Sequence, residues 1–386
     1  MDPLTKAIQI MTPFSFELLH TSKKSGARVG KIHTPHGTID TPNFVGVGTN
    51  GTLKSLDNSQ THAIGLQLMF CNTYHLLLQP GTEVVKQAGG LHKFINRSLP
   101  IITDSGGFQV FSLAYGSVAD ELKSKGTKKQ DGMVLKTSEE GVLFRSYRDG
   151  RKILLTPESS IQAQKDLGAD LIICFDELPP YHISKEALHG SLDRTHRWEE
   201  RSLIAHQKNP NSQALYAVIH GGIDPALRKK SCDFLTNLPF EGYAIGGSLG
   251  KNKQEMYEML SFVLPRLPKE KPNHLLGIGD LESLDLCIPL GIDTFDSSYP
   301  TRAARHGVLF TRKGALKVLK SCYAQDFHPI EEGCSCFTCS QFSLAYLHHL
   351  FKAKEATCMT LATIHNLHFM VEKMREYREK ILLDLL

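Results

Sequence analysis

The chain has 386 residues, of which 41% are hydrophobic and 22% charged, so it has a globular composition and the length for one large domain with an appendage or for two domains. No apolar run approaches the roughly 18 residues of a membrane-spanning helix, and residues 1–6 (Met-Asp-Pro-Leu-Thr-Lys) lack the pattern of a secretory signal. Most of the nine cysteines are scattered, which favours a reducing compartment, so we expect a cytoplasmic protein that binds no membrane.

The formal net charge is only +4, but the basic residues are unevenly distributed. No acidic residue lies between Asp296 and Asp326, and this stretch contains Arg302, Arg305, Arg312, Lys313, Lys317 and Lys320. A second basic cluster comprises Lys123, Lys125, Lys128 and Lys129. Such runs are either solvated surface or contacts for a polyanion. The first run is the more informative one because it directly follows Asp296, which ends a predicted strand.

A repeating pattern of strands and helices follows an N-terminal β-hairpin, which we predict within residues 12–50 with its turn at residues 35–37. The predicted strands are the short apolar runs Asn43–Val47, Leu66–Cys71, Pro100–Thr103, Asp170–Phe175, Ala214–Ile219, Gly242–Ile245, His274–Ile278 and Ile292–Phe295. The predicted helices between them include Pro157–Leu167, Lys185–His206, Pro225–Leu238 and Gln254–Leu264. Eight such strands alternating with helices predict an α/β fold, a (β/α)8 TIM barrel; an open doubly wound sheet is the alternative.

The sharpest local signal is a cysteine cluster after the last predicted strand. Cys334, Cys336 and Cys339 have C-x-C-x2-C spacing, and His365 follows. Three thiolates and one imidazole fill a tetrahedron, so we predict a closed, structural Zn²⁺ site. Buried apolar or disulfide-bonded cysteines are the alternative, although three thiols cannot pair evenly. Helices are expected at Gln341–Ala353 and, closing the chain, at Asn366–Leu386. We therefore divide the chain into a barrel with its hairpin cover (1–320), an inserted zinc-binding subdomain (321–366) and a closing helix (367–386).

Polar and glycine residues follow several of the predicted strands. Three carboxylates, Asp104, Asp176 and Asp296, stand at strand ends. Glycine pairs follow two further strands, after His220 and at Gly246-Gly247. In a TIM barrel these ends share one mouth, which holds the active site. Each aspartate alone could be a helix cap, but together they favour a site in which two carboxylates act at a sugar anomeric carbon.

The motifs resemble those of one family, the tRNA-guanine transglycosylases (queuine tRNA-ribosyltransferases). They are Asp-Ser-Gly-Gly-Phe-Gln at 104–109, Phe-Asp-Glu at 175–177, Ala-Ile-Gly-Gly at 244–247, Phe-Asp at 295–296 with Pro-Thr-Arg at 300–302, and the cysteine cluster with His365-Asn366. The match keeps the family's order from about residue 14 to about residue 370. The resemblance implies a barrel with one structural Zn²⁺ per subunit and a homodimer. It also implies exchange of the wobble guanine of tRNA for a 7-deazaguanine base, queuine or its 7-aminomethyl precursor, in queuosine modification.

The resemblance also implies roles for individual residues. Asp296 would be the nucleophile that forms a covalent RNA intermediate, and Asp104 the general acid/base. The base would be bound by Ser105, Gly106, Gly107, Phe108, Asp176, His220, Gly246 and Gly247. The anticodon loop would contact Gly277, Ile278, Gly279, Asp280, Leu281, Glu282, Ser283, Thr301, Arg302, Ala303, Ala304 and Arg305.

The chain departs from bacterial family members in the base pocket. Leu178 stands where they have Cys, His220 where they have Gln, and the loop at 246–250 is one residue shorter; Phe108 in place of Tyr is a minor change. The aliphatic residue in place of Cys and the shorter loop resemble the eukaryotic enzymes, so our hypothesis is a bacterial-type enzyme with an altered pocket that salvages queuine. Asp280 replaces a frequent Lys, which removes one expected RNA contact.

Three other functions deserve comparison. A non-catalytic, tRNA-binding partner subunit of a heteromeric transglycosylase would keep the fold, but Asp104 and Asp296 are both present here. A glycoside hydrolase would use the same two carboxylates but would need aromatic platforms, and the only tryptophan, Trp198, lies in a charged helix. The archaeal branch has a long C-terminal RNA-binding extension that this sequence lacks.

Overall fold

The core is a closed parallel barrel. The computed structural model describes residues 14–116, 122–123, 125 and 133–386. Eight of the described strands form the barrel in the order β4-β5-β6-β10-β11-β12-β13-β14, and β14 pairs with β4 to close it. Their bounds are Asn43–Val47, Met69–Cys71, Ile101–Thr103, Leu171–Ile173, Ala214–Ile219, Gly242–Ile245, Asn273–Leu275 and Thr294–Ser297. Each lies within or overlaps a predicted strand, so the predicted (β/α)8 barrel is confirmed and the open sheet is wrong.

The barrel strands are short and apolar because both of their faces are buried. Side chains that point inward, such as Val45, Ile102 and Val218, form one hydrophobic cluster. Side chains that point outward, such as Phe295 and Ile245, form a larger cluster with the surrounding helices. This double burial is typical of parallel sheets covered by helices and explains why these strands were recognisable as continuous apolar runs.

The helices between the strands follow ordinary capping rules. Helix α7 (Pro157–Leu167) begins after Thr156, whose side chain accepts a hydrogen bond from the Ser159 N–H, and ends at Gly168. The helices around the barrel are α1 (Asn58–Ile64), α2 (Thr73–Leu78), α3 (Thr82–Gln87), α4 (Leu91–Phe94), α5 (Gly107–Tyr115), α7, α8 (Lys185–Gln207), α9 (Pro225–Leu235), α10 (Lys253–Val263), α11 (Leu281–Cys287) and α12 (Tyr299–Arg305), with 3-10 turns at Leu264–Arg266 and Ile288–Leu290.

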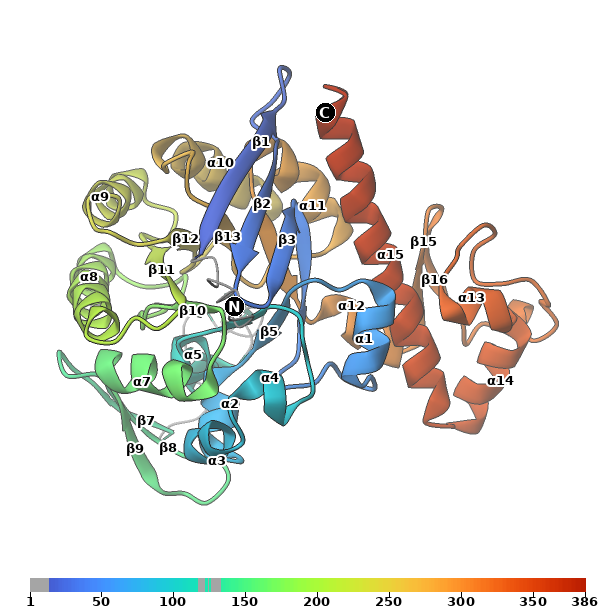
Figure 1. The fold of residues 1–386 in the computed structure, drawn as a ribbon, viewed down its shortest axis with the longest axis horizontal. Coiled ribbons are helices and arrows are strands. Elements are labelled where there is room, and N and C mark those ends of the chain that lie inside the picture. The colour runs from blue at the N-terminus through green and yellow to red at the C-terminus, as the bar shows by residue number, and fades with distance from the viewer. Residues whose placement is uncertain (1–13, 117–121, 124, 126–132) are drawn as a thin grey trace, which may run out of the picture.

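Two small antiparallel sheets accompany the barrel. The N-terminal sheet has three strands, β1 (Ser15–Thr21), β2 (Arg28–Thr34) and β3 (Gly37–Thr41), rather than the two of a hairpin (Figure 1). A buried ion pair between Arg28 and Asp293 fastens this sheet to the start of β14. The second sheet, β7 (Val134–Thr137), β8 (Val142–Arg145) and β9 (Lys152–Leu155), lies between β6 and β10 in the chain. Lys128 and Lys129 of the second basic cluster lie outside the described residues.

A C-terminal lobe lies beside the barrel (Figure 1). It contains β15 (Val308–Thr311), β16 (Gly314–Lys317), a 3-10 turn at Ser321–Tyr323, α13 (Phe337–Gln341) and α14 (Leu344–Ala353). The last helix, α15 (Thr357–Leu382), packs against α12 of the barrel and against α13, α14 and β15 of the lobe. It therefore joins the two parts of the fold.

Two helix predictions for this region differ from the structure. The predicted helix 341–353 begins at Leu344, because Gln341 ends α13 and Ser343 caps α14. The closing helix begins nine residues before Asn366, at Thr357, because Cys358, Leu361 and Ala362 bury their side chains against the lobe despite several weak helix formers in this region. The predicted division at residue 366 therefore falls inside one continuous helix. Among the described residues, no helix has the length and apolar character needed to cross a membrane.

Candidate active site and metal centre

Asp104 follows strand β6 and lies in a buried polar environment. Its Oδ1 accepts a hydrogen bond from the Thr73 N–H at 2.7 Å, and its Oδ2 accepts from the side-chain amides of Asn72 at 2.7 Å and Gln109 at 2.9 Å. Burial raises the pKa of Asp104 to about 6 although these hydrogen bonds lower it, and the charge of Asp296 adds to the rise. A carboxyl group with such a pKa can both donate and accept a proton near neutral pH, as general acid/base catalysis requires.

Asp296 belongs to strand β14 and points into the same mouth of the barrel. Its side chain is buried, and its Oδ1 accepts a hydrogen bond from the Gly277 N–H at 2.7 Å. His274 Nε2 lies 3.1 Å from the same oxygen. Within the described part of the chain, Oδ2 has no hydrogen bond. The two predicted catalytic carboxylates thus have different environments, which is how one site divides proton transfer from nucleophilic attack.

A second polar group surrounds Asp176, which follows strand β10. The Ser105 hydroxyl donates to Asp176 Oδ1 at 3.1 Å, and His220 Nε2 lies 2.8 Å from Oδ2. The Gly107 N–H donates to the Ser105 hydroxyl at 3.2 Å. A Cβ at residue 107 would lie 2.6 Å from the Asp176 carbonyl oxygen, so only glycine fits there. The structure therefore brings four of the predicted base-binding residues together, and they present hydrogen-bonding groups of the kind that read a base edge.

The glycine loops after β11 and β12 complete this end of the site. Gly247 has a φ of +76°, and a Cβ there would lie 2.7 Å from His220 Nδ1, so glycine lets the loop pass close to the imidazole. The preceding residue, Gly246, lies at the end of β12. The buried Arg228 of α9 donates hydrogen bonds to the Ile219 carbonyl at the end of β11 (2.6 Å) and to one carbonyl of each loop, those of Gly222 (2.8 Å) and Ser248 (3.0 Å). This guanidinium group fixes the two loops relative to each other.

A cavity of about 380 Å³ opens beside the Asp176 group. Gly107 and Asp176 line it, and it extends toward Leu178 and the residues up to Ser184. The cavity has the size of a small-molecule site. Of the other predicted base-binding residues, Gly106 caps the N-terminus of α5, and the side chain of Phe108 is 46% exposed on the first turn of that helix.

The predicted RNA-binding residues of α12 differ in exposure. Arg302 is exposed, whereas Thr301, Ala303 and Ala304 are buried against the fold. Arg305 is partly buried, and its Nη1 donates to the Thr301 carbonyl at 3.1 Å. Arg302 is therefore the side chain on this helix that is best placed to meet a phosphate.

The turn at residues 277–283 carries the remaining predicted RNA contacts. Gly277 and Glu282 are exposed, Ile278 and Leu281 are partly buried, and Gly279 and Ser283 are buried. Asp280 caps α11, because its Oδ1 accepts from the Ser283 N–H at 3.2 Å. Lys253 pairs with Asp280 at 2.6 Å and also with Glu282. The ammonium group of Lys253 is therefore paired with two carboxylates of this turn.

The cysteine cluster forms a candidate metal centre. The Sγ atoms of Cys334, Cys336 and Cys339 lie 3.9, 3.6 and 3.3 Å from His365 Nδ1. Tetrahedral Zn–S and Zn–N bonds would separate these donors by about 3.6 Å, so the spacing fits a metal ion. His365 Nε2 bonds to the Phe310 carbonyl at 2.7 Å, which leaves the Nδ1 lone pair for the ion. The four side chains could therefore hold a metal between the lobe and α15.

Sequence reasoning missed several residues of the site. Asn72 and Thr73 directly follow strand β5, so the strand-end rule that selected Asp104 would also have selected them. Gln109 lies within the motif at 104–109 but had no predicted role. His274 lies inside a strand, and no sequence pattern marks it as a site residue, because its contact with Asp296 depends on the pairing of β13 with β14.

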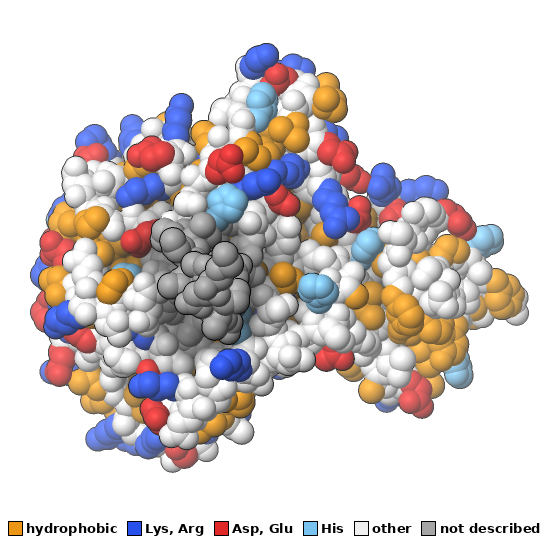
Figure 2. All heavy atoms as spheres, in the orientation of Figure 1, with side chains coloured by type: hydrophobic (Ala, Val, Ile, Leu, Met, Phe, Trp, Pro, Cys, Tyr) orange, Lys and Arg blue, Asp and Glu red, His pale blue; other side chains and the backbone are white. Residues whose placement is uncertain are grey.

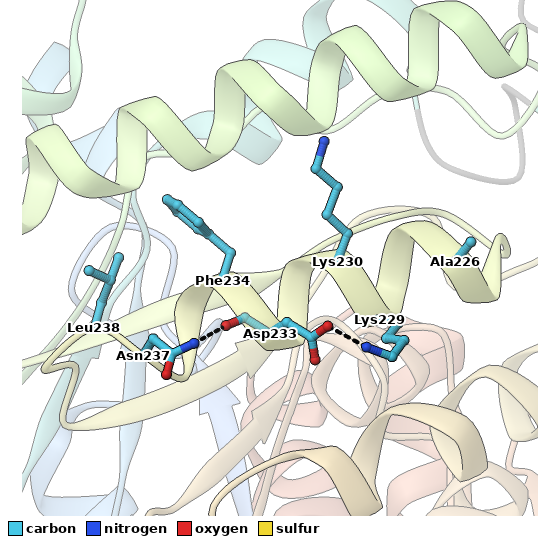
Figure 3. Close-up of a pocket in the computed structure, with 7 residues that line it drawn as sticks. All are labelled: Ala226, Lys229, Lys230, Asp233, Phe234, Asn237 and Leu238. Atoms are coloured by element: carbon cyan, nitrogen blue, oxygen red, sulfur yellow. Dashed lines mark hydrogen bonds and ion pairs between the residues drawn. The ribbon is translucent and has the colours of Figure 1, made fainter.

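A separate surface hollow lies on the outside of the barrel and is lined by residues 226–238 (Figure 3). Phe234 points from α9 toward α8, where its ring stacks on His196 at 4.5 Å between centroids. Lys229 forms an ion pair with Asp233 within α9. Because the hollow lies between outer helices, away from the strand ends, we assign no chemistry to it.

Comparison with known proteins gives a consistent result along the whole chain. The family model described as "Queuine tRNA-ribosyltransferase" matches residues 22–386. A queuine tRNA-ribosyltransferase of Protochlamydia amoebophila is 72% identical over 381 residues, which cover 99% of this chain and 98% of that protein. The proteins of the same name from Chlamydia caviae and Chlamydia trachomatis serovar L2 are 56% and 57% identical over 371 residues, which cover 96% of this chain and 98% of each relative.

Proposed function

The chain belongs to the queuine tRNA-ribosyltransferase family, the tRNA-guanine transglycosylases, and from this premise we propose how it works as an enzyme. It exchanges the guanine at the anticodon wobble position of tRNA for a 7-deazaguanine base. The reaction is a double displacement through a covalent aspartyl-RNA intermediate. The observation that carries this proposal is the contrast between two carboxylates at one barrel mouth, of which one has a pKa of about 6 and the other has an oxygen without a hydrogen bond among the described residues.

In the first half-reaction, Asp296 attacks C1′ of the flipped-out nucleotide and Asp104 protonates the departing guanine. In the second half, Asp104 removes a proton from the incoming base, which then displaces Asp296 from C1′. The raised pKa of Asp104 supports both roles, because the group can hold a proton in one half and release it in the other near neutral pH.

Base recognition falls to the group around Asp176. Its carboxylate can accept hydrogen bonds from the ring N–H and amino group of guanine or a 7-deazaguanine, which have the same pyrimidine edge. Support comes from the contacts of Asp176 with Ser105 and His220, which orient the carboxylate at the barrel mouth. Phe108 covers the face of the bound base, and the backbone of Gly246 and Gly247 approaches its edge.

We further propose that queuine is the incoming base. Leu178 lines a cavity of about 380 Å³ beside Asp176, and the loop after β12 is short. The additional ring of queuine needs such space, whereas the aminomethyl precursor does not. The cavity beside Leu178 supports queuine as the incoming base, although leucine is larger than the cysteine of bacterial family members.

The anticodon loop binds across α12 and the turn at 277–283. Arg302 offers an exposed guanidinium group to the phosphates, and Lys253 adds an ammonium group beside Asp280. The acid-free run after Asp296 leaves α12 without a carboxylate of its own. The turn at 277–283 does carry two, Asp280 and Glu282, and both are paired with Lys253.

A structural zinc ion and a second subunit complete the proposed protein. Cys334, Cys336, Cys339 and His365 would hold one Zn²⁺ per chain, with no ligand position left for a substrate. A homodimer is supported by hydrophobic side chains gathered on the lobe that holds α13 and α14 (Figure 2). Phe337 and Tyr346 are 57% and 42% exposed there. Since the substrate is tRNA, the proposed compartment is the cytoplasm.

A base-exchange assay tests the proposal. Unmodified tRNA with a wobble guanine is incubated with the enzyme and labelled guanine, the aminomethyl base or queuine, and nucleosides are identified by mass spectrometry. Incorporation of queuine is expected, and the same tRNA with adenine at the wobble position is the control. No exchange of any base would refute the activity and favour the alternative, a non-catalytic tRNA-binding partner subunit. Equal or better turnover of the aminomethyl base would refute the queuine hypothesis alone.

A further inference from the structure

The two oxygens of Asp296 are held differently. Oδ1 accepts a hydrogen bond from the Gly277 N–H at 2.7 Å and lies 3.1 Å from His274 Nε2. Oδ2 has no hydrogen bond within residues 14–116, 122–123, 125 and 133–386. Only Oδ2 therefore keeps its lone pairs available for a bond to carbon.

His274 is fixed by the register of two barrel strands. It lies opposite Thr294 in the pairing of β13 with β14, and Asp296 follows Thr294 on the same face two residues later. The imidazole is fully buried, its Nδ1 lies 2.8 Å from the Thr294 hydroxyl, and its ring stacks on Phe70 at 6.0 Å between centroids. A side chain held on three sides has one orientation.

The hydrogen bonds also determine which nitrogen carries a proton. The Thr294 hydroxyl has a single hydrogen, which goes either to His274 Nδ1 or to the Asn273 carbonyl 3.2 Å away. In the first case Nε2 carries the ring proton and donates it to Asp296. In the second case Nδ1 donates to the hydroxyl, and Nε2, which faces the ionised carboxylate of the nucleophile, donates to it from an imidazolium ring. Both arrangements make His274 a donor to Oδ1.

We propose that His274, oriented by Thr294, is the positioning residue of the nucleophile: it holds Oδ1 of Asp296 as an anion and thereby makes Oδ2 the attacking atom. This inference rests on the proposed function. In the attack, a lone pair of Oδ2 forms the bond to C1′ while the C1′–N9 bond breaks, and its electron pair goes to guanine, which receives the proton of Asp104. In the return step N9 of the incoming base, after losing its proton to Asp104, bonds to C1′, and the C1′–Oδ2 electron pair returns to Asp296.

Two replacements of His274 distinguish the effect of its hydrogen bond from the effect of its side-chain volume. His274→Gln keeps an amide donor near the position of Nε2, whereas His274→Leu fills a similar space without a donor. His274→Leu removes a hydrogen bond to a charged carboxylate and so leaves the nucleophile less well oriented. We therefore expect it to slow adduct formation with saturating tRNA about 10- to 100-fold. His274→Gln should stay within about tenfold of the wild type, because it keeps a donor. The affinity for tRNA should change in neither variant, because His274 is buried below the binding surface.

Thr294→Val provides a second test that leaves the imidazole in place. Loss of the hydroxyl should slow adduct formation in the wild-type background, but should add little in the His274→Leu background, because the two residues act as one unit. If His274→Leu does not fold, Thr294→Val and His274→Gln alone decide the outcome: a slow Thr294→Val enzyme with a nearly intact His274→Gln enzyme supports the proposal.

The outcomes distinguish this inference from the proposed function. Wild-type rates of adduct formation in His274→Leu or Thr294→Val would overturn the role of His274 while leaving the function intact. An equal decrease in the rate of adduct formation in His274→Gln and His274→Leu would also overturn the role of His274, because the hydrogen-bond donor would then be irrelevant. So would a defect that appears as weaker tRNA binding instead of slower adduct formation. Absence of any adduct with the wild-type enzyme would overturn the proposed function, and this inference with it.

Discussion

Replacing Asp104 with asparagine should stabilise the protein in a pH-dependent way. Burial raises the pKa of Asp104 from its ordinary value of 3.8 to about 6, which corresponds to about 3 kcal/mol between the charged and neutral forms. Because the folded-state pKa lies above the unfolded one, folding takes up a proton between these values. The wild type therefore loses stability as the pH rises from about 4 through about 6.

The size of the effect follows from the two pKa values. The charged carboxylate costs the native state about 1.6 kcal/mol at pH 5 and about 3 kcal/mol at pH 8, so the advantage of Asp104→Asn should grow by about 1.4 kcal/mol between them. The new amide can be accommodated, because its Oδ1 still accepts from the Thr73 N–H. Asn72 and Gln109, which both donate to Oδ2 in the wild type, can turn their side-chain amides so that their oxygens accept from the new Nδ2. Gln109 Oε1 has no other partner among the described residues.

Urea unfolding of the wild type and of Asp104→Asn at pH 5 and pH 8 measures this difference directly. The variant should be nearly inactive at both pH values, because an amide cannot exchange the proton. A stability difference that is the same at pH 5 and pH 8 would show that Asp104 titrates normally, and the acid/base role would lose its physical basis.

Two further predictions concern the metal centre and the RNA surface. Chelation, or Cys336→Ser, should remove zinc and unfold or dissociate the protein as activity falls, measured by circular dichroism and gel filtration; an inactive apoprotein that stays folded and dimeric would argue for a catalytic metal. Arg302→Ala should weaken tRNA binding and reduce the slope of log affinity against log salt by about 0.7, whereas Lys229→Ala in the outer hollow should not. An unchanged slope in Arg302→Ala would return the basic run to ordinary solvated surface.

The barrel was predictable because its strands are buried on both faces. A run such as Ala214–Ile219 is fully buried, so every position must be apolar and the strand stands out from the polar loops around it. The N-terminal strand Ser15–Thr21 was harder to separate, because it is mostly exposed and lacks a regular alternation. The start of α15 at Thr357 was missed because packing against the lobe, rather than helix propensity, sets it.

The sequence predicts which aspartates lie at the candidate site, but not which side chains contact them. The strand-end rule selects Asp104, Asp176 and Asp296, because parallel strands end at one mouth. It cannot say that His220 contacts Asp176 or that His274 contacts Asp296, since these pairs depend on strand register and loop course. Nor can sequence alone give a raised pKa, which results from the burial of the carboxyl group in the folded chain.

The most direct test of the account is the identity of the nucleophile. The enzyme is mixed with wobble-guanine tRNA, denatured, and separated on a denaturing gel, and the RNA-linked peptide is identified by mass spectrometry. We expect a denaturant-stable adduct on the peptide that contains Asp296, and its complete loss in Asp296→Ala. An adduct that persists in Asp296→Ala, or that maps to another residue, would contradict the account.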